Sequence, residues 1–127
     1  MNVSTDRLLA LPKGLLKVGY RCNNRCLFCH SAPHRNIDAT TEQLQEKIVL
    51  AHRAKIAMVV FSGGEPTVRP DLYALAGAVQ KNGMRIGLIT NGRMLFYETL
   101  RHKLLALDLG YVQLTLAGAS APLHDRV

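Results

Sequence analysis

An α/β fold with a parallel sheet is predicted by the sequence from three observations. Short apolar runs that suit buried strands alternate with longer segments whose apolar residues recur at helical spacing. Turn residues, above all glycine and asparagine, separate the two kinds of segment. The chain has 127 residues, enough for one domain with one core. Regular strand–helix alternation predicts right-handed βαβ units and therefore parallel strands.

Four segments are predicted as strands. The clearest is 57–62, a continuous apolar run of the kind that is buried on both faces in parallel sheets. It ends at Gly63-Gly64-Glu65-Pro66, where two glycines and a proline break the extended pattern. The other predicted strands cover residues 15–21, 84–90 and 111–116.

Start and stop signals predict the helices between these strands. Thr40 with Gln43 three residues later fits a capping box, so the first helix begins directly after Thr40. The second opens at Pro70, a favoured first helical position, and ends at Gly83, which suits a left-handed cap. A third is predicted over 94–107, and the last residues resemble the opening of a fourth.

Residues that could bind a ligand or take part in catalysis follow each predicted strand. A cysteine loop follows the first strand and the Gly-Gly-Glu-Pro segment follows the second. Thr90-Asn91-Gly92 follows the third, and Leu116-Ala117-Gly118 follows the fourth. In parallel α/β folds the carboxyl ends of the strands share one edge, where ligands bind. We therefore expect these four segments to meet in one site.

The composition is that of a globular, basic protein. Apolar residues make up 48% of the chain, and no apolar run approaches the roughly 18 residues of a membrane span or forms a convincing signal peptide. We therefore expect a cytoplasmic protein. The formal net charge is +7, but basic residues are not interleaved with aromatic ones, so the charge does not favour a nucleic-acid partner.

The only cysteines of the chain are Cys22, Cys26 and Cys29, spaced C-x3-C-x2-C. An odd number of cysteines at tight spacing argues against a disulfide framework and for a metal site. Three thiolates can hold three corners of a [4Fe–4S] cube and leave the fourth iron free to bind a small molecule. Two alternatives stay open: a zinc site with His34 as fourth ligand, and a redox-active pair formed by Cys26 and Cys29.

Taken together, the motifs resemble those of the radical SAM superfamily. The cysteine triplet with Phe28 before its last member, Gly63-Gly64-Glu65-Pro66 and Thr90-Asn91-Gly92 carry the resemblance, in that order. It implies a partial (β/α)6 TIM-like barrel with about four parallel strands and three to four helices. It also divides the chain into an N-terminal lead-in, 1–14, and a radical SAM core, 15–127, that corresponds to the first four βα units.

The resemblance further implies a chemistry. Cys22, Cys26 and Cys29 would hold a [4Fe–4S] cluster, and S-adenosyl-L-methionine (SAM) would bind its open iron. One electron from a small flavodoxin- or ferredoxin-type protein would cleave SAM reductively to a 5′-deoxyadenosyl radical, which abstracts hydrogen from a substrate. The family acts on peptides, cofactor precursors and nucleotides, and the motif set favours a peptide.

Several single residues receive roles from the same resemblance. Phe28 would contact the adenine, and Gly63 and Gly64 would let the backbone approach the methionyl ammonium closely. Glu65 would act on that site either through the ammonium or through the geometry of the loop. Pro66 would stiffen the turn.

Other polar residues are expected around the same pocket. Thr115 would lie near the SAM ribose, and Asn91, at the end of the third strand, is a second candidate there. Arg25 and His30 flank the cysteines and could tune the cluster. The remaining histidines show no partner pattern, and we expect them at the surface: His52, His102 and His124.

The length of the chain leaves two interpretations open, because a (β/α)6 barrel needs on the order of 180–200 residues. In the first, the chain belongs to a radical SAM enzyme whose barrel is completed by a missing C-terminal segment or by a partner chain. In the second, it is a catalytically incomplete iron–sulfur or zinc-binding fragment that acts as a binding module. Either way, the fourth strand would have an exposed edge that needs cover.

Overall fold

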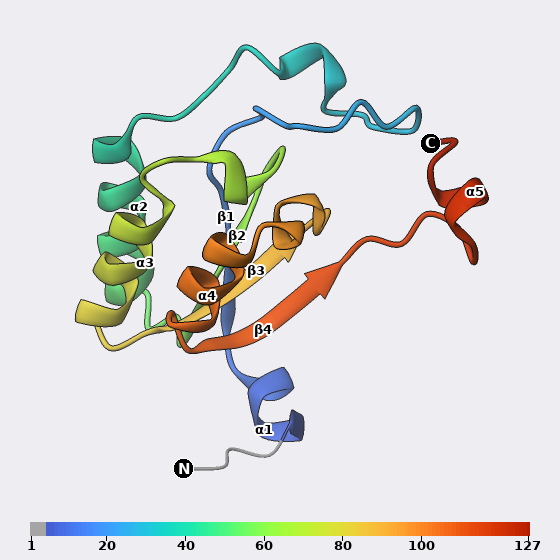
Figure 1. Cartoon of the computed structure of the whole chain (residues 1–127). Coiled ribbons are helices and arrows are strands. Elements are labelled where there is room, and N and C mark those ends of the chain that lie inside the picture. The colour runs from blue at the N-terminus through green and yellow to red at the C-terminus, as the bar shows by residue number, and fades with distance from the viewer. Residues whose placement is uncertain (1–4) are drawn as a thin grey trace.

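The computed structural model describes residues 5–127 as one parallel sheet with helices packed on one side (Figure 1). The strands are β1 (Lys13–Lys17), β2 (Met58–Ser62), β3 (Arg85–Thr90) and β4 (Leu109–Leu114). They pair in the order β1-β2-β3-β4, and every pair is parallel. The predicted α/β class with four parallel strands is confirmed.

The helices of the described part are α1 (Thr5–Ala10), α2 (Thr41–Arg53), α3 (Leu72–Lys81), α4 (Glu98–Leu105) and α5 (Ala121–His124), with short 3-10 turns η1 (Ala32–His34), η2 (Pro66–Val68) and η3 (Arg93–Phe96). The predicted capping box of α2 is confirmed, because Thr40 Oγ1 accepts from Gln43 N and Gln43 Oε1 accepts from Thr40 N. Gly83 follows α3 with φ of 72°, as expected. Among residues 5–127, none of these helices has the length and apolar character that crossing a membrane requires.

The core lies between the sheet and the three helices α2, α3 and α4. Alternate residues of β2 and β3 face it, namely Val59 with Phe61 and Ile86 with Leu88, each at most 2% exposed. The helices contribute the other half of the layer: Leu44, Ile48, Leu72, Leu75, Ala76, Val79 and Leu104. Burial of a large aliphatic or aromatic side chain stabilises by about 1.5–3 kcal/mol. This layer therefore holds the helices against the sheet.

The predicted third helix over 94–107 is wrong in one respect, because the structure divides it. Tyr97 is extended (φ −81°, ψ 116°) and separates η3 from α4. The break turns Phe96 to solvent, with 84% of its surface exposed, whereas Leu104 is buried. After the break, Leu104 belongs to the core, and Leu100 and Leu107 pack against it.

Two predicted strands, 15–21 and 111–116, begin two residues too late, since β1 starts at Lys13 and β4 at Leu109. β1 ends early because Gly19, with φ of 136°, turns the chain and forms an isolated antiparallel bridge to Asp38. Before β4, the turn is made by Asp108, with φ of 49°. Gly110 lies inside the strand, where a Cβ would come within 2.8 Å of Arg85 Nε.

β4 forms an open edge of the sheet in the described part of the chain. Val112 and Leu114 lie on this strand with 47% and 50% of their surface exposed. Unpaired backbone groups beside exposed apolar side chains are typical of a strand that another element covers.

Arg69, between η2 and α3, joins three parts of the backbone. Its guanidinium forms a bidentate ion pair with Asp71, at 2.8 and 2.7 Å, and donates to Asp38 Oδ1 at 2.9 Å. It also donates to the carbonyls of Val18 and Ala39, at 2.7 and 3.0 Å, on either side of the cysteine loop. The Arg69 side chain is only 8% exposed, and no sequence motif pointed to it.

Arg69→Met should lower the free energy of unfolding by about 3–5 kcal/mol, because Asp38 and Asp71 would lose their shared counter-ion in a partly buried setting. Urea denaturation followed by circular dichroism measures the change. Arg53→Met, on an exposed position of α2, is the matched control and should shift the free energy by less than about 0.5 kcal/mol. Equal effects of the two substitutions would contradict a structural role for Arg69.

Acid should destabilise the fold through Asp71. The hydrogen bonds from Arg69 hold the pKa of Asp71 below its usual value; burial opposes this, and the Thr41 hydroxyl, at 2.6 Å, adds to it. A lowered folded pKa gives stability that is present above the unfolded pKa, about 3.9, and is lost as the pH falls through the folded value. Urea midpoints should therefore fall below about pH 5, and less steeply in Asp71→Asn. An identical acid dependence in this variant would exclude Asp71 as the cause.

Candidate active site

The cysteine loop leaves β1 and crosses the carboxyl ends of the strands, as predicted (Figure 1). Cys22, Cys26 and Cys29 are half-buried and form no disulfide. They are not gathered into a closed site, since across residues 5–127 no three cysteine, histidine or acidic side chains are grouped as metal ligands. His34, the fourth ligand of the zinc alternative, instead places its ring 5.6 Å from that of Tyr20.

Gly63 and Gly64 hold the base of the loop against the end of β2. Gly64 N donates to Gly19 O and Glu65 N donates to Arg21 O, both at 2.8 Å. A Cβ on Gly63 would lie 2.3 Å from Gly19 O, and a Cβ on Gly64 would lie 2.2 Å from Arg21 O. The glycines are thus required by the packing of the loop backbone, and their approach to a ligand stays a prediction.

The Glu65 carboxylate is buried, with 1% of the residue exposed, between the ends of two strands. Its Oε1 accepts from Thr67 N and Oγ1, at 3.2 and 2.6 Å, and from Thr90 Oγ1, at 2.6 Å. Its Oε2 accepts from Asn91 N at 2.7 Å. Pro66, also buried, starts η2 directly after it. These bonds favour the loop-geometry role of Glu65 over a direct contact with an ammonium.

Asn91 extends this link to the cysteine loop. Its side-chain Nδ2 donates to Asn23 Oδ1 at 2.9 Å and to Cys22 Sγ at 3.8 Å, while its backbone N–H is held by Glu65. Arg93 adds a second contact, because its Nη1 donates to Asn23 O at 2.5 Å. The carboxyl end of β3 therefore positions the first part of the loop.

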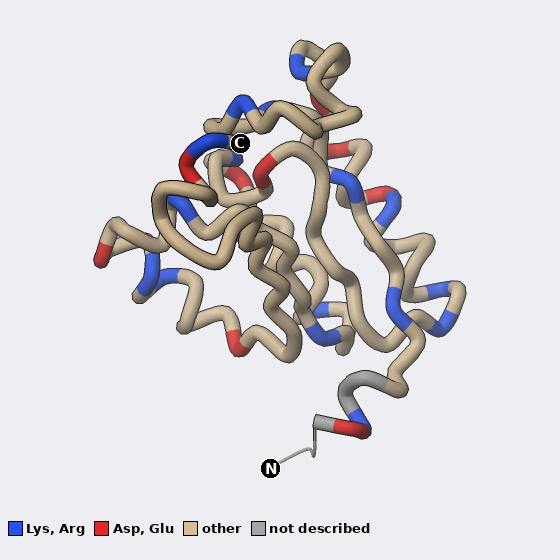
Figure 2. The backbone as a smooth tube through the Cα atoms, turned by 90° about the vertical axis from the view of Figure 1, so that its right-hand side faces the viewer, with Lys and Arg blue, Asp and Glu red and all other residues tan. Residues whose placement is uncertain are grey.

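The donor set suits an iron–sulfur cluster. The three thiols lie on one loop, and Cys22 Sγ accepts hydrogen bonds from Asn24 N, at 3.4 Å, and from Asn91 Nδ2. N–H donors to ligand sulfurs orient such ligands and tune the bound metal. Residues 19–37 contain no carboxylate, so the loop is basic and lacks the charged oxygen ligands that hard cations favour (Figure 2).

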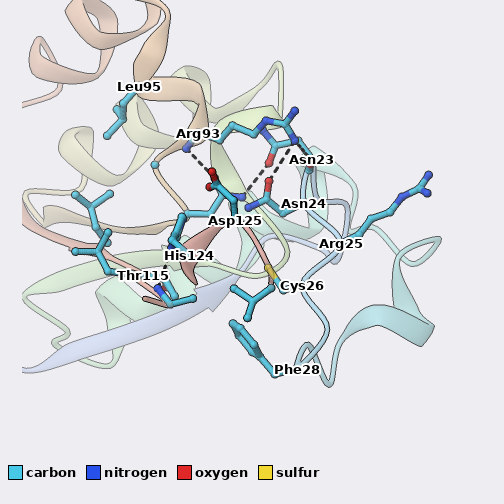
Figure 3. A pocket seen from close by; sticks show the side chains of 16 residues that line it. Asn23, Asn24, Arg25, Cys26, Phe28, Arg93, Leu95, Thr115, His124 and Asp125 are labelled. Atoms are coloured by element: carbon cyan, nitrogen blue, oxygen red, sulfur yellow. Dashed lines mark hydrogen bonds between the residues drawn. The ribbon is translucent and has the colours of Figure 1, made fainter. Parts of the chain in front are cut away.

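A cavity of about 840 Å³ opens between the cysteine loop, the ends of β3 and β4, and α5 (Figure 3). Five of the residues expected around the site line it: Arg25, Cys26, Phe28, Asn91 and Thr115. The volume is in the range of small-molecule sites. The other residues expected there lie outside its lining: Cys22, Cys29, His30, Gly63, Gly64, Glu65 and Pro66.

His124 was expected at the surface, and that expectation is wrong. The residue is half-buried, lines the cavity and accepts a hydrogen bond on Nδ1 from Ala117 N at 3.0 Å. His52 and His102 are exposed, as expected. Thr90 was also missed, although it begins the Thr-Asn-Gly motif that pointed to this strand end.

The chain matches one protein family and is similar to several characterised proteins. The family model of the radical SAM superfamily matches residues 16–127. The PqqA peptide cyclase of Streptomyces rochei is 32% identical over 118 residues, which are 90% of this chain and 32% of that protein. The Fe-coproporphyrin III synthase of Methanosarcina barkeri is 36% identical over 102 residues, which are 77% of this chain and 25% of that protein. The chain thus spans about a third or less of the length of these relatives.

Solved structures share the fold. Streptococcus suis SuiB bound to the precursor peptide SuiA has a TM-score of 0.74 at 20% identity, covering 92% of this chain and 27% of that chain. SuiB bound to S-adenosylmethionine has a TM-score of 0.73 at 22% identity, covering 92% and 28%. The family match extends over the cysteine loop, the Gly-Gly-Glu-Pro turn and all of β2 to β4, and the chain belongs to the radical SAM superfamily.

Proposed function

We propose that this chain forms part of the core of a radical SAM enzyme, with a [4Fe–4S] cluster on Cys22, Cys26 and Cys29 and SAM in the adjoining cavity. The observation that carries the proposal is the link from Glu65 through Asn91 to Cys22, which aligns the cysteine loop with the cavity. When bound, the cluster would supply one electron that breaks the sulfonium C–S bond of SAM, giving methionine and a 5′-deoxyadenosyl radical able to abstract hydrogen from a substrate.

The residues of the chain would bind and orient the ligand. Cys26 and Phe28 reach the cavity from the loop, whereas Asn91 and Thr115 reach it from the strand ends, so a ligand there would touch both sides. Phe28 is 60% exposed as a residue, so its ring would be available to stack on an adenine. The Thr115 hydroxyl would serve the ribose. Glu65 would act indirectly, because its hydrogen bonds hold the protein backbone and side chains around the site and do not reach the ligand.

A peptide substrate and a small electron-donor protein of flavodoxin or ferredoxin type belong to the same proposal. Two similar proteins support the peptide, since one is a PqqA peptide cyclase and the other, SuiB, was solved with the precursor peptide SuiA. A further segment or a partner chain would cover β4 and complete the barrel. We further propose that residues 1–14 form a lead-in and residues 15–127 the radical SAM core. The proposed location is the cytoplasm.

A second candidate is a binding module without turnover. The observation that favours it is the open edge at β4, where Val112 and Leu114 are about half exposed in the described part of the chain. Such a module would hold iron or zinc on the cysteine loop and bind a partner through that edge.

Cys26→Ala should abolish cluster assembly, because two thiolates would leave two irons without a protein ligand. After anaerobic reconstitution, wild-type protein should contain about four irons per chain and should form 5′-deoxyadenosine from SAM on reduction. His34→Ala, the control, should keep its iron.

The other outcomes separate the alternatives. Full iron content in Cys26→Ala would show that the ligand assignment is wrong. Iron without 5′-deoxyadenosine would support the binding module. Zinc at about one per chain, lost in His34→Ala, would support the tetrahedral zinc site.

Glu65→Gln should weaken SAM binding while iron is retained, because the amide replaces one of the two acceptor oxygens and Asn91 loses the partner that holds it near Cys22. The free energy of unfolding should fall by about 1–3 kcal/mol, the cost of a buried donor left unsatisfied. Equilibrium dialysis of SAM and urea denaturation measure the two effects. Glu46→Gln, exposed on α2, is the control. Unchanged values in Glu65→Gln would show that the hydrogen bond between Glu65 and Asn91 does not position the cysteine loop.

A further inference from the structure

His124 is joined to the end of β4 by two separate contacts. Its Nδ1 accepts the backbone N–H of Ala117 at 3.0 Å. Beside it, Gly118 approaches α5 so closely that a Cβ there would lie 2.6 Å from His124 N and 2.8 Å from Leu123 Cβ. The single turn of α5 is therefore held against the strand end, and the imidazole has a defined position.

The hydrogen bond from Ala117 also determines which ring nitrogen carries the proton. A nitrogen that accepts an N–H must present its lone pair, so Nδ1 is unprotonated and the ring proton lies on Nε2. The hydrogen bonds of residues 5–127 include none from this Nε2, which leaves it as an available donor. Protein donors of this kind, when fixed by a second contact, are suited to orient a ligand.

The ring lies in the wall of the cavity beside other polar groups. His124 shares the lining of the cavity with Thr115 and Asp125, which Figure 3 labels. A hydroxyl, an imidazole donor and a carboxylate in the lining of one cavity suit a ligand group that both accepts and donates hydrogen bonds, which is the property of a ribose hydroxyl. A ligand carboxylate can pair with the guanidinium of Arg25 or Arg93, which also line the cavity, and a sulfonium would gain nothing from an N–H donor.

We propose that His124 is a nucleoside-binding residue, whose Nε2–H donates to a ribose oxygen of the ligand in the cavity. The identity of that ligand as SAM rests on the proposed function. The role of Ala117 is then to hold the imidazole in the donating tautomer.

The first test needs no cluster and no ligand. In the full chain labelled with 15N-histidine, long-range 1H–15N correlation spectra report which nitrogen of each imidazole is protonated. His124 should show one tautomer, protonated on Nε2, while exposed His52 should show a mixture. Protonation of His124 on Nδ1, or an average like that of His52, would overturn the inference whatever the protein does with SAM.

The second test measures binding to the reconstituted protein. In His124→Asn the amide oxygen can still accept from Ala117, but the donor at Nε2 is gone, so the Kd for SAM should rise about three- to tenfold. His124→Gln, which returns an amide N–H near the position of Nε2, should recover part of the affinity. His52→Asn is the matched control and should bind like wild type. Wild-type affinity in His124→Asn would refute the role of His124.

A nucleoside probe distinguishes a contact with the ribose of SAM from a contact with its methionine carboxylate. 5′-Methylthioadenosine has the ribose and adenine but no amino acid, so His124→Asn should weaken its binding by the same factor. Weaker binding of SAM alone would place the contact at the methionine carboxylate and overturn the ribose assignment. Failure of wild-type protein to bind SAM at all, with the His124 tautomer as expected, would count against the proposed function and remove the ribose assignment with it.

Discussion

One buried carboxylate organises the carboxyl edge of the sheet. Glu65 accepts two hydrogen bonds from Thr67 and one each from Thr90 and Asn91, in a place that water hardly reaches. A buried charge is tolerated only while its donors stay in place. The ends of β2 and β3 are therefore held in one arrangement. Asn91 connects them to the cysteine loop, because its Nδ2 donates to Cys22 Sγ. The site depends on this interaction more than on any single residue in the cavity.

Arg69 complements Glu65 on the other side of the cysteine loop. It binds the carbonyls of Val18, before the loop, and of Ala39, after it, so the loop is fastened where it leaves the sheet and where it enters α2. Between these anchors the thiols are half-buried. A loop that is fixed at both ends by a rigid scaffold can adjust to a bound group without disturbing the core.

The sequence was most informative where local rules decide the structure. The capping box of α2, the buried run of β2 and the position of the motifs after each strand depend on near neighbours and were predicted. The break at Tyr97 was not, because a continuous helical pattern gives no sign of it. Gly63-Gly64 was found as a motif, but its packing reason needs the loop backbone from another strand. Arg69 and His124 were missed because their partners are distant along the chain or are backbone atoms.

The exposed apolar side chains at the open edge of β4, in the described part of the chain, affect how the protein behaves in solution. Val112 and Leu114 on β4 and Leu116 just after it expose 47%, 50% and 82% of their surface. In the described part of the chain β4 is an edge strand, and such an edge lets one molecule extend the sheet of another. A formal charge of +7 keeps molecules apart by mutual repulsion. Added electrolyte shortens the reach of that repulsion, to about 8 Å at physiological ionic strength. Colloidal stability is therefore greatest in dilute buffer and declines as salt is added.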